Sequence, residues 1–277
     1  MKKQENLYVY SRFLERVKDY NLPLYMVGSS SKGNSTLLTN INTIIDLGYS
    51  YKHYTDIDPN FFLQCDYVIF THEHGDHFNP HTFVKLIDNH PNIKFIMTSH
   101  MAHAIQNKQE THEIITDARI NKLIETNRIL NGDFKQILHT RQHLHDDDIR
   151  YVPHITSHGD ITNVAVEIIT PTDHIMYASD LDNFRPNFEK HTEGLPEPDS
   201  HHLFTLLLLE ANYDEKLVED ALADNPQNFE ALGNKRHISE QTTFPYVEKY
   251  LSDDGVFIPL HASKNYGTLI QDTKWLL

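Results

Sequence analysis

Residues 71–77 are Thr71-His72-Glu73-His74-Gly75-Asp76-His77, a stretch with three histidines and an aspartate within six positions. It follows the apolar run at 67–70, which predicts a buried strand with the cluster in the loop at its end. Imidazole and carboxylate groups at this density are typical ligands of divalent transition metals, and they need no thiolate. The chain contains 20 histidines, so a chance cluster on the surface is the alternative to a metal site.

The spacing within this cluster favours two metal ions. His72 and His74 are two positions apart, so in extended backbone their side chains point the same way and can share one ion. Gly75 is expected to let the chain turn sharply, which would allow Asp76 and His77 to face a second ion. The two histidines are not four apart, which excludes the His-Glu-x-x-His motif of helical zinc proteases.

Composition indicates a globular protein. The chain has 277 residues, of which 39% are hydrophobic and 10% aromatic. It shows no repeat, linker or apolar run of bilayer length, and no apolar segment follows its first residues as in a secretory signal. Its one cysteine, Cys65, excludes an intrachain disulfide and is typical of a reducing compartment. We therefore expect a cytoplasmic protein without membrane contact.

The charge balance limits the kind of partner. The formal net charge is −15, from 24 basic and 39 acidic side chains. Non-specific binding of long nucleic acid depends on many contacts from lysine and arginine to phosphate, so this surface disfavours it. Two bound divalent ions would concentrate positive charge at one place. A short or locally held phosphate substrate is therefore compatible with the composition.

Periodicity and turn residues predict the remaining elements. Residues 1–21 form an N-terminal extension with helical spacing at 10–20, for which an oligomer contact is the alternative to packing on the domain. Residues 28–35 are expected to be the loop of a hairpin, since they lack the phosphate-loop pattern. Helices are expected at 80–89, 100–107, 214–223 and 236–251, with partial helical periodicity at 115–129. Strands are expected at 22–27, 36–38, 43–47, 67–70, 93–98, 150–156, 164–170, 174–178, 202–209 and 256–260.

Metal-competent residues recur where the predicted strands end. Strands that share a sheet have ends that lie near one another, so these residues can converge on one edge. His154 competes with His158 as a ligand, but it lies inside its strand rather than at the end, which favours His158. The five strand-terminal residues are His72, His158, Asp180, Glu210 and His261.

The motif at 72–77 resembles the His-x-His-x-Asp-His signature of the metallo-β-lactamase superfamily. Residues 45–48 resemble its second-strand ending, and the segments ending in His158, Asp180 and His261 resemble its remaining ligand motifs in the expected order. The resemblance extends from about residue 22 to the C-terminus. It implies an α/β fold, a four-layer αββα sandwich in a single domain at 22–277 that follows the helical extension at 1–21.

Finer features resemble one branch of this superfamily. Residues 28–35, 209–214, 236–239 and 261–265 are similar to segments of the short exonuclease-like members, and the last three more distantly to segments of ribonuclease Z. Those relatives cleave phosphodiester bonds in nucleic acid. The chain departs from them at Arg236, where glycine is usual, and in its acidic surface. Both departures concern the substrate rather than the chemistry.

The resemblance also implies roles for individual residues. Asp180 would bridge two divalent transition-metal ions, zinc in the first instance with manganese or iron as alternatives, at about the 3.5–4 Å typical of two-metal sites. Asp76 would orient the hydroxide formed between the ions, and His237, oriented by Glu210, resembles the proton donor to the leaving group. The alternatives for that pair are a histidine at a helix start and a buried acid that caps a chain end. Ser263 and Lys32 are expected to contact the substrate. The ligands would be His72, His74 and His158 at one ion, and Asp76, His77 and His261 at the other.

The function expected on this basis is that of a dinuclear metal-dependent hydrolase, a phosphodiesterase or nuclease acting on nucleic acid or a nucleotide. One alternative is a hydrolase of a small ester, thioester, lactam or cyclic nucleotide, which the acidic surface would suit. Another is a metal-stabilised binding protein without turnover. That protein would need the metal ligands but neither His237 nor Glu210.

Overall fold

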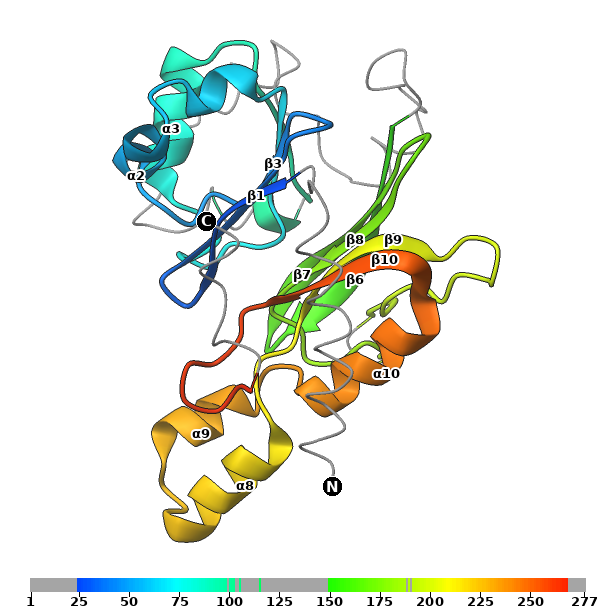
Figure 1. Cartoon of the computed structure of the whole chain (residues 1–277). Helices are drawn as coiled ribbons and strands as arrows, with labels where there is room; N and C mark the ends of the chain where they lie inside the picture. The colour runs from blue at the N-terminus through cyan, green and yellow to red at the C-terminus, as the bar shows by residue number, and fades with distance from the viewer. Residues whose placement is uncertain are drawn as a thin grey trace. The chain divides into compact units, whose positions relative to one another are not determined.

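The computed structural model describes residues 24–98, 100–102, 105, 115, 149–187, 189 and 191–268, which fall into two compact units (Figure 1). The N-terminal unit is described between residues 24 and 115, and the C-terminal unit between residues 149 and 268. The predicted extension at 1–21, most of the predicted helix at 100–107 and nearly all of the helical periodicity at 115–129 lie outside the described residues.

The N-terminal unit contains a mixed five-stranded sheet in the order β1-β2-β3-β4-β5. The strands β1, β2 and β3 are antiparallel neighbours, whereas β4 and β5 continue the sheet in parallel from β3. The predicted strands are present, with ends that differ by a few residues. Their bounds are β1 (Leu24–Ser30), β2 (Gly33–Leu38), β3 (Thr43–Ile45), β4 (Tyr67–Ile69) and β5 (Lys94–Ile96).

The predicted hairpin between β1 and β2 is present, but the predicted loop at 28–35 is wrong. The strands continue through it, with Gly28 paired to Ser35 and Ser30 to Gly33, which leaves a turn at residues 31–32. Tyr49 explains the glycines, because its hydroxyl donates to the Gly33 carbonyl at 2.9 Å. A Cβ on Gly28 would lie 2.0 Å from the Tyr49 oxygen. Glycine is therefore needed at these positions because the Tyr49 ring packs against the backbone, and not because the segment is a flexible loop.

Helices α2 (Tyr51–Ile57) and α3 (Pro80–Asn89), with the 3₁₀ turn η1 (Phe61–Gln64), pack on the N-terminal sheet through one core cluster. Asn79 caps the predicted helix α3, accepting from the Thr82 amide at 3.0 Å, and Pro80 fits its first turn. The short elements α2 and η1 were not predicted. The core is rich in aromatic rings, and Phe83 and Phe95 meet edge to face at 4.7 Å between centroids.

The C-terminal unit has a second mixed sheet, in the order β10-β9-β8-β7-β6. Because β6 and β7, and β7 and β8, are antiparallel while β8, β9 and β10 are parallel, the C-terminal ends of β6, β8, β9 and β10 share one edge. The predicted convergence of strand ends is therefore present within this unit. The bounds are β6 (Arg150–His158), β7 (Ile161–Ile169), β8 (His174–Ala178), β9 (Phe204–Glu210) and β10 (Leu251–Leu260).

The described residues of the C-terminal unit include three helices: α8 (Glu215–Asp224), α9 (Phe229–Asn234) and α10 (Glu240–Tyr250). Asp214 caps α8 as predicted, accepting from the Leu217 amide at 3.0 Å. The expected helix start at Arg236 is wrong, because Ser239 is the cap of α10 and α9 ends just before Arg236. Apolar residues of α10 pack on the sheet with those of β9 and β10 (Figure 1). Within the described ranges, no helix has the length and apolar character needed to cross a bilayer.

Candidate metal centre

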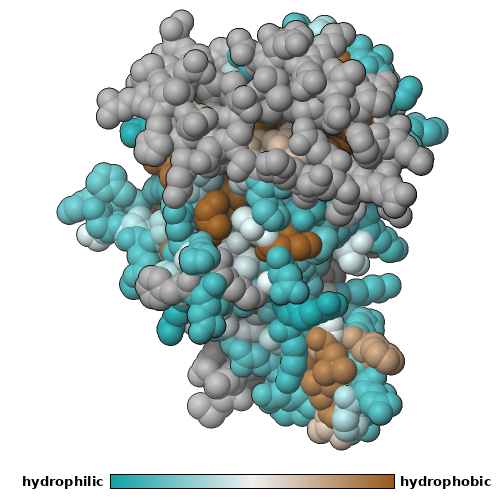
Figure 2. All heavy atoms as spheres, turned by 180° about the vertical axis from the view of Figure 1, so that it is seen from behind, coloured by the Kyte–Doolittle hydropathy of each residue, from teal (hydrophilic) through white to brown (hydrophobic). Residues whose placement is uncertain are grey.

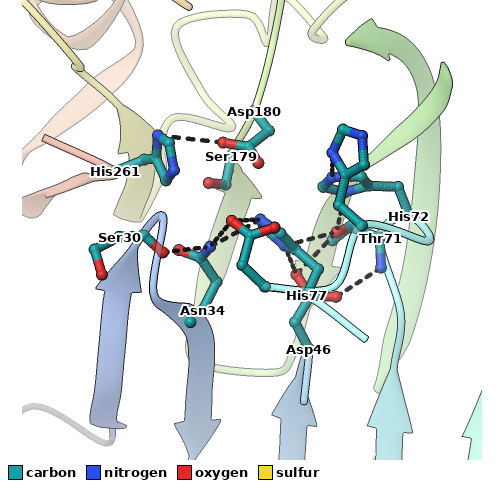
Figure 3. A network of polar contacts seen from close by, with 12 residues as sticks. Ser30, Asn34, Asp46, Thr71, His72, His77, Ser179, Asp180 and His261 are labelled. Atoms are coloured by element: carbon teal, nitrogen blue, oxygen red, sulfur yellow. Dashed lines mark hydrogen bonds and ion pairs between the residues drawn. The ribbon is translucent and has the colours of Figure 1, made fainter. Parts of the chain in front are cut away.

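Asp46 organises the ligand loop of the N-terminal unit. It follows β3, is fully buried and has a left-handed backbone conformation with φ of 61°. Its carboxylate accepts from the Thr71 amide and the Thr71 hydroxyl, each at 2.8 Å, and lies 2.7 Å from Nδ1 of His77 (Figure 3). Burial raises the pKa of Asp46 above its ordinary value, and the interactions with His77 and Thr71 oppose the rise. The residue ties the loop to the end of β3.

These contacts determine which ring nitrogens carry lone pairs. His77 donates from Nδ1 to Asp46, which leaves the lone pair of the ring on Nε2. The Thr71 hydroxyl gives its proton to Asp46 and therefore accepts from Nδ1 of His72, 3.0 Å away, which leaves the lone pair on His72 Nε2. That atom lies 3.0 Å from Nδ1 of His74. Two nitrogen ligands of tetrahedral zinc are about 3.3 Å apart, so the pair fits one edge of a metal site.

Asn34 joins the second half of the motif. Its side-chain nitrogen lies 2.9 Å from Nε2 of His77 and 3.3 Å from a carboxylate oxygen of Asp76. The His77 nitrogen and the Asp76 oxygen are 3.9 Å apart. The sequence indicated only a turn residue at Asn34, because its contact with the motif spans 42 positions.

The glycine needed beside the motif is Gly48, not Gly75. The expected turn is present at residues 75–77, but Gly75 has no positive φ and a Cβ there would meet nothing within 4 Å, so the turn does not require a glycine. A Cβ on Gly48, in contrast, would lie 1.9 Å from the carbonyl oxygen of Asp76. Gly48 therefore lets the backbone of the ligand loop approach the end of β3.

The C-terminal unit brings together Asp180, Glu210, His237 and His261, whose ligand atoms all lie within 4.8 Å of one another. Nδ1 of His261 is 3.3 Å from Asp180, toward which the ring points in Figure 3. Nδ1 of His237 lies 2.6 Å from Glu210 and 3.8 Å from Asp180. Two carboxylates and two imidazoles in this space match the donors that zinc, manganese or iron prefer.

Two of these residues have a strained backbone. Asp180 and His261 follow β8 and β10 with φ of 56° and 51°, a region that residues other than glycine rarely adopt. In each case an asparagine amide holds the backbone. Asn163 donates to the carbonyl of Asp180 at 2.5 Å, and Asn212 donates to the carbonyl of His261. Sequence reasoning missed both asparagines.

Glu210 and His237 form a close pair. Burial tends to raise the pKa of Glu210, but the hydrogen bonds from His237 and His261 outweigh it, so the pKa lies below its ordinary value. Glu210 is fully buried, and its second oxygen accepts from the Leu181 amide at 2.7 Å. A charged Glu210 thus accepts a hydrogen bond from Nδ1 of His237, and Nε2 of that ring lies on the side away from Glu210.

The remaining predicted residues have distinct surroundings. The His158 ring lies 5.0 Å from that of His237 between centroids, whereas His154 is 2.8 Å from Glu167, away from this cluster. Lys32 lies exposed at the β1–β2 turn of the N-terminal unit. The Ser263 hydroxyl accepts from the backbone amide three residues later at 3.3 Å, which shapes the loop after His261.

Comparisons with known proteins identify the fold. No protein-family model and no curated protein matches the sequence. Human tRNase Z, short form, matches the structure with a TM-score of 0.51 and 12% identity, over 87% of this chain and 93% of that one. The metallo-β-lactamase fold protein YhfI from Bacillus subtilis matches with a TM-score of 0.54 and 16% identity, over 92% of each chain. The chain has the metallo-β-lactamase fold, and the predicted α/β fold class is confirmed.

Proposed function

We propose that this chain is a metal-dependent hydrolase that cleaves phosphodiester bonds in nucleic acid or a nucleotide. The observation that carries the proposal is the 2.6 Å pair of Glu210 and His237 beside Asp180 and His261. A metal cluster alone would serve many hydrolases or a binding protein, and this pair adds a proton donor. The name of one protein of similar fold, human tRNase Z, supports the same class of substrate.

The metal ligands we propose are those that the sequence motifs indicated. When bound, two divalent ions supply a water of lowered pKa and neutralise charge on the phosphoryl oxygens. Asp46 and Thr71 fix the tautomers of the histidines in the N-terminal unit, and Asn163 and Asn212 fix the backbone of two ligands in the C-terminal unit. The proposed set is His72, His74, Asp76, His77, His158, Asp180 and His261.

The Glu210–His237 pair favours an alkoxide leaving group. Departure of an alkoxide from phosphorus needs a proton, which an imidazole held at Nδ1 can deliver from Nε2. A thioester releases a thiolate, whose parent thiol has a pKa of about 8.5, so it gains little from such a donor. Glu210 orients the ring of His237 rather than taking part in the transfer, because it lies on the Nδ1 side.

The test combines metal analysis with a substrate panel. Protein purified without chelator is assayed for transition metals by mass spectrometry and for cleavage of bis-nitrophenyl phosphate, single- and double-stranded DNA, RNA and cyclic nucleotides. We expect close to two metal equivalents and turnover of at least one phosphodiester. The variant Asp180→Asn should lose both, while His202→Ala, with its side chain 75% exposed, should lose neither. Metal-replete protein that cleaves none of these phosphodiesters would refute the proposal.

A further inference from the structure

An unusually exposed aromatic ring lies on α9. Phe229 is 88% exposed and Leu232, on the same helix, is 43% exposed. Figure 2 shows an apolar patch over the α8–α9 end of the C-terminal unit. Phe229 is the most exposed large hydrophobic side chain within the described ranges. A single exposed apolar residue is ordinary, but a contiguous patch is typical of a binding surface, although the patch does not by itself say what is bound.

The charges around this ring indicate the ligand. Lys235 and Arg236 follow α9 directly, and Lys264 lies in the loop after β10. All three are exposed, and none has an ion pair among the described residues. Lys216 on the neighbouring helix α8 is, in contrast, held by a carboxylate at 2.9 Å. In a chain of net charge −15, three exposed cations without an ion pair in the described part of the chain, following α9 or in the loop after β10, favour an anionic ligand with flat apolar groups.

Two hydrogen bonds bring the ring and the loop together. The Asn228 amide donates to the Tyr266 hydroxyl at 2.9 Å, and the Asn265 amide donates to Glu230 at 2.7 Å. The neighbours of Phe229 on both sides are thus tied to the two residues that follow Lys264. The loop starts at His261, and the chain after α9 leads to His237. Both segments that form this surface are therefore connected to residues of the candidate metal centre.

We propose, on the basis of the proposed function, that this surface binds single-stranded nucleic acid. The ring of Phe229 stacks on a base, and the cations contact phosphates; Phe229, Lys235, Arg236 and Lys264 are called here the α9 platform. At 1.5 Å per residue, α9 spans roughly 7.5 Å from Phe229 to Asn234, and a turn then leads to His237. The helix alone corresponds to about two base steps of 3.4 Å, so a strand that reaches from His237 to the ring is longer than a dinucleotide. Bases of a duplex are paired and stacked internally, so only a single strand offers one to Phe229.

The test measures binding rather than turnover. Fluorescence anisotropy compares a labelled 12-nucleotide strand with an abasic strand of the same length, in a His237→Ala background that spares the strand from cleavage. Phe229→Ala should weaken binding of the normal strand about 5- to 150-fold and leave the affinity for the abasic strand unchanged. Phe229→Trp should retain affinity and Phe229→Leu should lose it, because stacking needs a ring rather than apolar area. Dinucleotides are too short to reach from His237 to the ring, so their affinity should be the same for the parent and for the Phe229 variants.

The cations are tested by salt dependence. Lys264→Ala should lower the slope of log affinity against log salt concentration by about 0.7, the value for one phosphate contact on a single strand. The matched variant Lys216→Ala, whose lysine already pairs with Asp220, should not change the slope. Equal slopes for both variants would overturn the phosphate contact at Lys264.

The outcomes separate this inference from the proposed function. If Phe229→Ala binds both strands as tightly as the parent does and the wild-type chain cleaves phosphodiesters, the proposed role of the α9 platform is wrong and the proposed function stands. If binding depends on the base and on Phe229 but no phosphodiester is cleaved, the platform stands and the function is wrong. A change in sedimentation of Phe229→Ala with unchanged strand affinity would show a protein-binding surface instead. Phe229 is exposed, so these variants should fold normally.

Discussion

Replacing His237 by alanine should slow cleavage of an ordinary phosphodiester far more than cleavage of a nitrophenyl ester. A positioned general acid contributes about 10²–10⁴-fold to rate, or about 2.7–5.4 kcal/mol at 1.36 kcal/mol per decade. The ring is held at 2.6 Å by a fully buried carboxylate of lowered pKa, a charge-assisted bond that fixes its orientation. We therefore expect a loss of about 10³–10⁴-fold with an RNA or DNA strand.

The nitrophenyl ester provides the internal comparison. Nitrophenolate is a weak base that departs without a proton, so His237→Ala should cost less than about tenfold with bis-nitrophenyl phosphate. Single-turnover rates for both substrates, with metal content measured on the same samples, give the ratio. Glu210→Gln should show the same selectivity because it misorients the ring, and His202→Ala should show none. Equal losses on both substrates, with reduced metal content, would make His237 a metal ligand and refute its role as proton donor.

Three further perturbations test the surroundings of the site. Asp46→Asn should lower metal affinity about 10–100-fold, measured by competition with a chelator, because Asp46 orients His77. Gly48→Ala should lower the free energy of unfolding in urea by about 1–3 kcal/mol, since its Cβ would lie 1.9 Å from a backbone carbonyl, whereas Gly75→Ala should change it by less than about 0.5 kcal/mol. Burial tends to raise the pKa of Glu167, but the hydrogen bonds from His154 and His174 outweigh it and lower the pKa to about 2. The contribution of Glu167 to stability is therefore present above about pH 4.5 and lost as pH falls toward 2. The stability advantage of wild type over Glu167→Gln in urea should therefore shrink between pH 5.5 and pH 3; a constant difference would contradict it.

The sequence by itself determined the elements and the chemical character of the site. Runs such as 67–70 and 174–178 predict strands because periodicity and turn residues act within a few positions of each other. Strand-terminal residues such as Asp180 and His261 stood out because they end apolar runs and can bind metal. The density of ligands at 72–77 indicated metal chemistry, and the order of the motifs along the chain indicated the fold that the structure confirms.

The tertiary structure decided which residues hold the ligands and which glycine matters. Asp46 meets His77 across 31 positions, and Asn212 meets His261 across 49, through sheet register that no local pattern encodes. The sequence drew attention to Gly75 because glycine is common in turns, yet the close backbone approach that requires a glycine occurs at Gly48. Local patterns record what a residue prefers, whereas its partners depend on which strands become neighbours. Candidate ligands could therefore be proposed from the sequence, whereas the groups that hydrogen-bond to them could not.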